Sequence, residues 1–90
     1  MSPKFQLSSR VKQNILHLHL LGEFDGSAAC ELIKRIEEDS SGASKILVDT
    51  TELRVVHPFG RTVFKNRIGP LSRKLLGLTF VGKYRHQFEF

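Results

Sequence analysis

Hydrophobic and polar residues alternate along two neighbouring stretches near the N-terminus. Residues 5–11 alternate weakly, and residues 15–21, ILHLHLL, alternate clearly. In the second stretch three leucines share one face, while His17 and His19 lie on the other. A period of two is typical of strands, and the polar turn at residues 12–14 joins the two stretches. We therefore predict an N-terminal antiparallel hairpin.

An amphipathic helix is predicted next, over residues 27–39. Residues 22–26, GEFDG, are expected to break the second strand before this helix. Asp25 or Ser27 can cap the helix, because a side-chain oxygen there accepts a hydrogen bond from a free backbone N–H. Apolar residues recur on one stripe of this helix, at Ala28, Ala29, Leu32, Ile33 and Ile36.

The second half of the chain predicts two more strands and one more helix. The apolar run at residues 45–49, KILVD, is typical of a strand in the middle of a sheet. Residues 50–60 are expected to form a loop, followed by a helix over residues 60–76. Gly69-Pro70 lies inside that helix and predicts a kink or two short helices. Residues 78–82, LTFVG, predict the last core strand.

The order of these elements predicts an α/β fold. Strand, helix and strand in sequence form a βαβ unit, whose strands are parallel and whose crossover is right-handed. We predict a small mixed sheet of about four strands, in which the N-terminal antiparallel hairpin precedes parallel βαβ units and helices pack on the sheet. Ninety residues suit one domain, residues 1–90. The tail after residue 82 predicts one helical turn or a short edge strand.

Charge is distributed unevenly along the chain. The net charge is +5, with −2 in residues 1–53 and +7 in residues 54–90. A basic face would attract an anionic partner, but a solvated basic surface without any ligand explains the charge equally well. No apolar run is long enough to span a membrane, so a cytoplasmic location is expected.

The one cysteine and the histidines of the N-terminal strands give little indication of a disulfide or a metal site. Cys30 is the only cysteine, which excludes an internal disulfide, and its apolar neighbours predict a core-packing role. His17 and His19 could chelate a metal, but only Glu23 lies near as a third ligand, so a half-exposed strand face is the favoured interpretation. No metal or other cofactor is predicted.

Catalysis is not predicted either. His57 beside Asp49 is the one pair that merits a test, and no nucleophile with a matching base, phosphate loop or metal motif accompanies it. We therefore expect a protein that is not an enzyme.

The carboxyl ends of the parallel strands are the expected binding edge, as in other open sheets. Asp25 and Asp49 are predicted to lie at this edge together with the 50–60 loop. The free N–H groups at the start of the second helix would suit an anion there; they belong to Gly60, Arg61 and Thr62. The local alternative is that both aspartates only cap turns.

Two segments resemble the STAS domain, which occurs in anti-sigma factor antagonists and in the tails of sulphate transporters. Residues 22–38, GEFDGSAACELIKRIEE, resemble the strand end and first helix of that domain. Residues 49–60, DTTELRVVHPFG, match without gaps the family segment that begins with aspartate and ends in Asp-Ser-Ser-Gly. The likeness covers roughly residues 5–82 and implies a STAS-like fold. It also implies a regulatory module whose partner is a protein such as a kinase-like anti-sigma factor.

One departure from the family pattern bears on function. In the antagonists the first serine of Asp-Ser-Ser-Gly is phosphorylated, which switches partner binding. Here the matching residues are His57-Pro58-Phe59-Gly60, and Pro58 has no hydroxyl to phosphorylate. The sequence therefore predicts a divergent STAS-like protein without the serine switch. Thr50, Thr51 and Thr62 are the nearest hydroxyls, and nothing in their surroundings marks them as substitutes.

The leading hypothesis is a protein-binding surface around the second helix, with Phe59 as its apolar anchor and Arg61, Lys65 and Arg67 as steering charges. The full predicted set is Asp25, Asp49, His57, Pro58, Phe59, Gly60, Arg61, Thr62 and Lys65. The alternative is a nucleic-acid or anionic-ligand binding protein that uses the basic half. Its interspersed aromatic residues are Phe64, Tyr84, Phe88 and Phe90.

Overall fold

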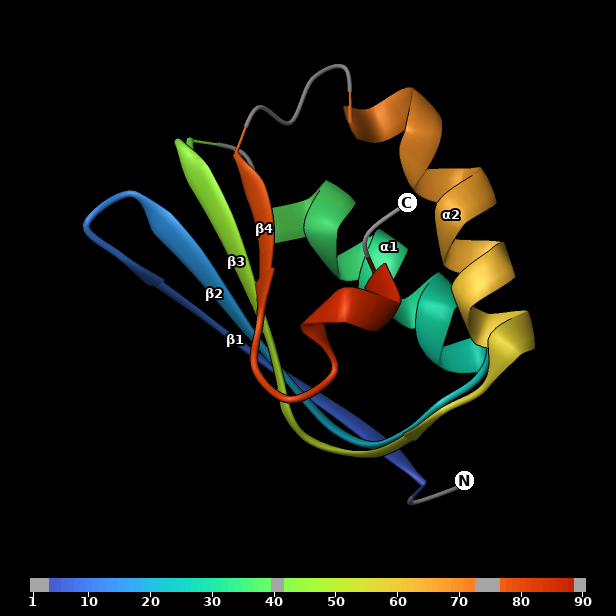
Figure 1. Cartoon of the computed structure of the whole chain (residues 1–90). Coiled ribbons are helices and arrows are strands. Elements are labelled where there is room, and N and C mark those ends of the chain that lie inside the picture. The colour runs from blue at the N-terminus through green and yellow to red at the C-terminus, as the bar shows by residue number, and fades with distance from the viewer. Residues whose placement is uncertain (1–3, 40–41, 73–76, 89–90) are drawn as a thin grey trace.

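The computed structural model describes residues 4–39, 42–72 and 77–88, which form a four-stranded sheet with both helices on one face (Figure 1). The elements are β1 (Phe5–Lys12), β2 (Ile15–Phe24), α1 (Gly26–Asp39), β3 (Lys45–Val56), α2 (Pro58–Ser72), β4 (Leu78–Val81) and the 3₁₀ helix η1 (Arg85–Phe88). The strand order is β1-β2-β3-β4; β1 and β2 are antiparallel, and the other pairs are parallel. The predicted α/β fold is confirmed.

The hairpin between β1 and β2 turns where the sequence predicts. Gln13 and Asn14 both have positive φ, 54° and 66°. Two such residues in a row form the tight turn whose twist matches that of the flanking strands. The register pairs Lys12 with Ile15 and Phe5 with Gly22.

β2 is longer than predicted and ends at Phe24, so the expected break over residues 22–26 lies at Asp25 and not at Gly22. Gly22 adopts φ +94° inside the strand, and the N–H of Glu23 donates to the carbonyl of Lys4 at 2.7 Å. The strand then continues to Phe24, which pairs with Val56 of β3. The glycine bends the strand without ending it, and the extra residue of the register shift beside it, Arg54, lies on β3.

β3 is also longer than predicted, and most of the expected 50–60 loop is strand. It extends to Val56, and only His57 separates it from α2. The register between β2 and β3 shifts twice, between His19 and Leu21 and between Gly22 and Glu23. Each shift changes the spacing of buried positions on β3. Apolar and polar residues therefore no longer alternate regularly there, and this alternation is the pattern that predicts a strand.

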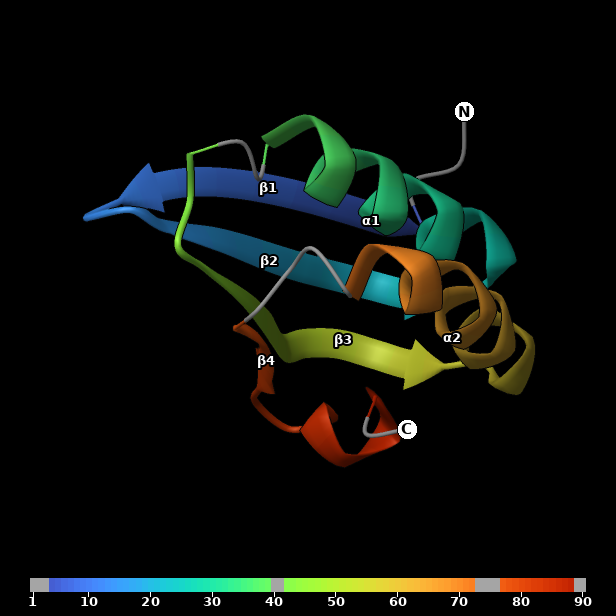
Figure 2. The same ribbon diagram turned by 90° about the horizontal axis from the view of Figure 1, so that it is seen from above.

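The core lies between the sheet and the two helices, which lie side by side on it (Figure 2). The predicted stripe of α1 is buried there, together with Leu16, Leu18 and Leu20 of β2. Cys30 is exposed instead, so its predicted core role is wrong; it lies beside the buried stripe rather than in it.

α2 begins at Pro58, two residues before the predicted start, and passes through Gly69 and Pro70 as one helix. A division into two helices is therefore wrong, while the predicted end over residues 73–76 lies outside the described residues. β4 and the single helical turn of the tail, η1, confirm the predictions for the C-terminal part. Within the described ranges, the helices are too short and too polar to cross a membrane.

Candidate protein-interaction site

The N-termini of α1 and α2 meet at one end of the sheet. The N–H of His57 donates to the carbonyl of Phe24 at 2.9 Å, which ties the end of β3 to the end of β2. Gly60 is buried against this junction: a Cβ there would lie 2.7 Å from the carbonyl oxygen of Phe24 and 2.8 Å from that of Asp25. A side chain at position 60 would therefore push the first turn of α2 away from α1.

Asp25 caps α1, as predicted. Its Oδ1 accepts a hydrogen bond from the N–H of Ala28 at 2.9 Å, and its carbonyl accepts one from the N–H of Ala29. Capping satisfies N–H groups that the first helical turn would otherwise leave without partners. The carboxylate of Asp25 thus helps to fix where α1 begins.

The first turn of α2 is more fully bonded than the sequence suggests. His57 precedes the helix, and its carbonyl accepts from the N–H of Arg61 at 3.2 Å. The hydroxyl of Thr62 donates to the carbonyl of Pro58 at 3.1 Å. The N–H of Arg61 is therefore not available to the anion that was expected at this helix start.

Arg61 is also less free than expected as a steering charge. Its Nε donates to the carbonyl of Gln87 at 2.7 Å, linking α2 to η1. Tyr84 makes a similar link to β3, because its hydroxyl donates to the carbonyl of Arg54 at 2.8 Å. Both contacts hold the C-terminal segment against the sheet end that carries the site.

A small charged group lies beside the helix junction. Nε2 of His57 is 3.4 Å from Oε1 of Glu23, and Nη2 of Arg54 is 4.0 Å from Oε2 of the same carboxylate. All three side chains are at least partly exposed, so these pairs contribute little to stability. His57 thus faces Glu23 and not Asp49.

Asp49 lies away from the other predicted site residues. β3 continues for seven residues beyond it, which places it roughly 20 Å along the strand from the helix junction. Its Oδ2 is 3.6 Å from Nδ1 of His19, on the sheet face that the helices do not cover. The prediction that Asp49 and Asp25 share one edge is wrong because β3 does not end at Asp49. The pair of His57 and Asp49 that merited a test is not formed, because each has a different partner.

The surroundings of Asp49 lower its pKa. Partial burial acts to raise this pKa, but hydrogen bonds from the backbone and side chain of Thr51 and the nearby His19 outweigh it. The N–H of Thr51 lies 2.9 Å from Oδ1. A carboxyl whose pKa is lowered by folding stabilises the fold above its unfolded pKa and loses that contribution as the pH falls.

Replacing Asp49 with asparagine is therefore expected to weaken the acid sensitivity of folding. Wild type should lose stability as the pH falls below about 4, and Asp49→Asn should lose less, by under about 1 kcal/mol because the side chain is over a third exposed. Urea unfolding midpoints at neutral and acidic pH measure this difference. Glu52→Gln, an exposed carboxylate of the same strand, is the control. Equal acid sensitivity in wild type and Asp49→Asn would contradict the effect.

Phe59 is the most exposed large apolar side chain of the described residues, at 70%. Its ring lies over Gly26, where a Cβ would be 2.8 Å from Cε2 of Phe59. The ring borders a groove of about 630 Å³ between α1 and α2. The groove is lined by Gly26, Ser27, Cys30, Phe59, Val63, Asn66 and Arg67.

Sequence reasoning found only part of this groove. The sequence predicts Phe59 as an apolar anchor, but it predicts a core role for Cys30, which lines the groove. The position of Cys30 next to buried residues gives no signal that α1 and α2 leave a groove between them. Lys65 is exposed on α2, as is Thr62, so both are accessible at this end of the molecule.

Two of the aromatic residues named for a nucleic-acid surface are buried. Phe64 is 1% exposed and Phe88 is 4% exposed, and both belong to the core. Tyr84 is half-buried and packs against that core, while Phe90 lies outside the described residues. Phe64 and Phe88 therefore offer bases no aromatic platform.

In the described part of the chain, no three histidine, cysteine or acidic side chains lie close enough together to hold a metal. His17 and His19 lie on the uncovered face of the sheet, and the latter pairs with Asp49.

Comparison with known proteins identifies the fold. Neither a protein-family model nor a curated protein matches the sequence. Among solved structures, the crystal structure of Mglu matches 87% of this chain with a TM-score of 0.74 and 13% identity, but the match spans only 20% of that longer protein. An anti-sigma factor antagonist STAS domain from Rhodobacter sphaeroides matches with a TM-score of 0.68 and 8% identity, over 89% of this chain and 88% of the other.

A third structure, an anti-sigma factor antagonist from Mycobacterium paratuberculosis, has a TM-score of 0.69 and 15% identity, over 91% of this chain and 71% of the other. The protein therefore has the STAS-like fold that the two sequence segments imply. At these identities the likeness establishes the architecture and not the activity.

Proposed function

We propose that this protein is a non-enzymatic regulatory module that binds a protein partner through the groove between α1 and α2. The observation that carries the proposal is Phe59, a large aromatic side chain 70% exposed at the border of an apolar groove. Exposed apolar patches of this kind mark interaction sites, and aromatic anchors contribute most of the binding free energy at interfaces.

Charge around the groove favours an acidic partner surface. α2 carries Arg61, Lys65 and Arg67 and no acidic residue. Arg67 lines the groove and Lys65 is exposed near it. A partner that inserts an apolar side chain beside Phe59 and presents carboxylates at the rim would match both features. The STAS-like fold supports a regulatory role, since two of the similar structures are named as anti-sigma factor antagonists.

Control of this interaction by serine phosphorylation is not part of the proposal. The resemblance of residues 49–60 to the family segment aligns Pro58, the first residue of α2, with the phosphorylated serine. Thr50 is fully buried, donates to the carbonyl of Val81 and accepts from the N–H of Tyr84, so a kinase could not reach it without unfolding the strand. The pairing of His57 with Asp49, the one catalytic arrangement considered, is not formed, which favours a binding role over a reaction.

Replacing Phe59 with serine is expected to weaken partner binding by about thirtyfold or more, because loss of an interface anchor costs about 2 kcal/mol or more. The tagged protein first captures its partner from extracts of the source cells. The purified partner is then titrated calorimetrically against each variant. Lys65→Glu should mainly slow association and reduce its dependence on salt.

Val11→Ser is the matched control, because Val11 is also a large apolar side chain, 60% exposed, and lies on β1 away from the groove. This variant should bind like wild type. Equal binding by wild type and Phe59→Ser would overturn the assignment of the groove. Equal losses in Phe59→Ser and Val11→Ser would do the same, because they would point to non-specific apolar adhesion.

A further inference from the structure

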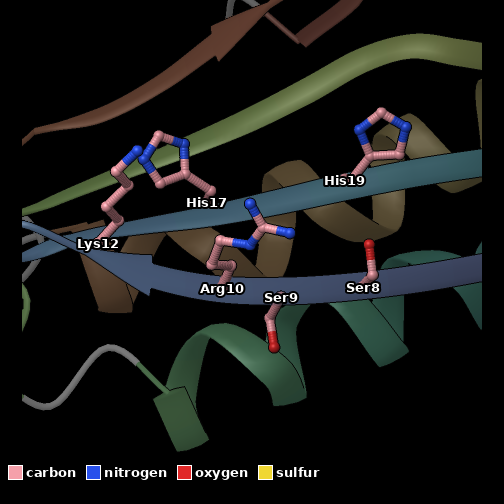
Figure 3. A pocket seen from close by; sticks show the side chains of 6 residues that line it. All are labelled: Ser8, Ser9, Arg10, Lys12, His17 and His19. Atoms are coloured by element: carbon pink, nitrogen blue, oxygen red, sulfur yellow. The ribbon is translucent and has the colours of Figure 1, made fainter.

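The sheet face opposite the helices carries a cluster of nitrogen-bearing side chains over the N-terminal hairpin. No described helix lies on this face (Figure 1). A hollow of about 450 Å³ opens there, lined by Ser8, Ser9, Arg10, Lys12, His17 and His19. Figure 3 shows that the cationic side chains rise from this face while Ser9 points toward α1. Consistent with that direction, the hydroxyl of Ser9 donates to Asp39 of α1 at 3.0 Å.

Strand register brings the donors of this cluster together. Arg10 of β1 is paired with His17 of β2, and Ser8 is paired with His19. Partners across an antiparallel pair have Cβ atoms about 5 Å apart, and residues two apart on one strand are about 7 Å apart. The side chains of this cluster therefore lie within an area the size of a small ligand. They are the guanidinium of Arg10, the ammonium of Lys12 and the imidazoles of His17 and His19.

The cations of this cluster are uncompensated. Arg10 and Lys12, its two cations, make no ion pair with any described residue, and the hollow has no carboxylate in its lining. Asp49, an acid that contacts the lining residue His19, also accepts a hydrogen bond from the N–H of Thr51. Like charges on adjacent positions of a sheet repel each other, and an anion bound among them would remove that repulsion.

We propose that this hollow binds a small ligand carrying phosphoryl groups. The planar guanidinium of Arg10 can donate two parallel hydrogen bonds to one phosphoryl group. Lys12 supplies a point charge, and the imidazole of His17 and the hydroxyl of Ser8 supply further donors. The hydrogen-bond donors span about 7 Å along the hairpin, which is longer than one carboxylate group. This span favours a ligand with more than one phosphoryl group. The volume lies in the usual range for small-molecule sites.

This site is independent of the proposed protein partner. The groove beside Phe59 lies between the helices, whereas the hollow is on the other face of the sheet. A nucleic-acid strand is the competing occupant, because its backbone offers the same phosphoryl chemistry. The lining of the hollow contains no phenylalanine, tyrosine or tryptophan for bases to stack on, so the small ligand is favoured.

The test is a two-dimensional ¹H–¹⁵N NMR titration of the whole chain with inorganic pyrophosphate, and separately with a single-stranded hexanucleotide of RNA. Pyrophosphate should shift amide signals of β1 and β2 around Arg10 and His17. Arg10→Gln should weaken its binding by about tenfold, since a charge-assisted hydrogen bond contributes about 1.5 kcal/mol or more. His17→Gln should weaken it in the same direction. The unligated spectra report whether each variant is folded.

Lys65→Gln removes one exposed cation from the other side of the molecule and is the matched control. It should leave pyrophosphate binding within about twofold of wild type, as expected for a change made outside the site. No shifts on β1 and β2, or equal losses in Arg10→Gln and Lys65→Gln, would overturn the proposal, the latter by indicating attraction to net charge alone. Tighter binding of the hexanucleotide than of pyrophosphate at the same residues would also overturn it, in favour of nucleic acid.

Discussion

Replacing Phe88 with alanine is expected to lower the stability of the fold by about 3 kcal/mol, although this residue lies close to the C-terminus. Its side chain is 4% exposed. The ring stacks on Phe80 at a centroid distance of 4.7 Å and meets Phe24 edge-on at 4.9 Å. Losing it removes apolar burial and leaves a cavity among the remaining rings. For a chain of this size the loss should lower Tm by about 12–24 °C.

Thermal and urea unfolding followed by circular dichroism measure this effect. Phe59→Ala is the control, since it makes the same chemical change at a ring that is 70% exposed and should cost under about 1 kcal/mol. An equal, small loss in both variants would mean that η1 does not belong to the core. Arg61 and Tyr84 also hold this segment, through hydrogen bonds to Gln87 and Arg54, so its docking does not depend on the ring alone.

The strands and helices whose apolar residues recur with one regular period were predictable from the sequence. Alternation over residues 15–21 indicates β2, and the apolar stripe of Leu32 and Ile36 indicates α1, because each pattern needs only one buried face. The order of these elements then predicts the parallel pairing, and the resemblance of residues 22–38 and 49–60 to the STAS domain implies the STAS-like fold. The seven residues that complete β3 were missed because two register shifts remove the alternation of apolar residues there.

The site was predictable only where chain topology determines it. Asp25 and Gly60 follow adjacent parallel strands, and the structure places them together as the rule for strand ends predicts. Asp49 was misplaced because that rule was applied to a strand end that does not exist. The burial of Phe88 and the groove beside Cys30 depend on how distant elements pack, so no local pattern indicates either.

The same register shifts connect the fold to the two proposed sites. They let β3 extend to Val56, so that His57 alone leads into α2 and the helix starts against the end of β2. Phe59 is thereby placed over Gly26 and faces solvent beside the groove. The hairpin before the first shift keeps regular pairing, which aligns Arg10 with His17 on the uncovered face. The shifted pairing of β2 with β3 thus positions the groove beside Phe59, and the regular pairing of β1 with β2 positions the hollow on the uncovered face.

The regular hairpin and the extended end of β2 both depend on the backbone conformation of Gly22. Its φ of +94° lies in a region that glycine adopts freely and other residues adopt at a cost of about 1–2 kcal/mol. A Cβ at this position would also collide with the carbonyl oxygen of Lys4. That oxygen accepts the hydrogen bond from the N–H of Glu23, so it cannot move aside without breaking the pairing of β1 with β2.

Gly22→Ala is therefore expected to destabilise the protein by about 2–5 kcal/mol, as the sum of the backbone conformational cost and the collision. Gly42→Ala separates the two causes, because Gly42 has a similar φ of +84° with no atom within 4 Å of the added Cβ. The control should lose only about 1–2 kcal/mol. Urea unfolding at neutral pH gives both values, and amide hydrogen exchange should show faster opening of β1 in Gly22→Ala alone. If the two alanine variants were equally stable, the collision with Lys4 would have no energetic weight and Gly22 would not hold the hairpin in register.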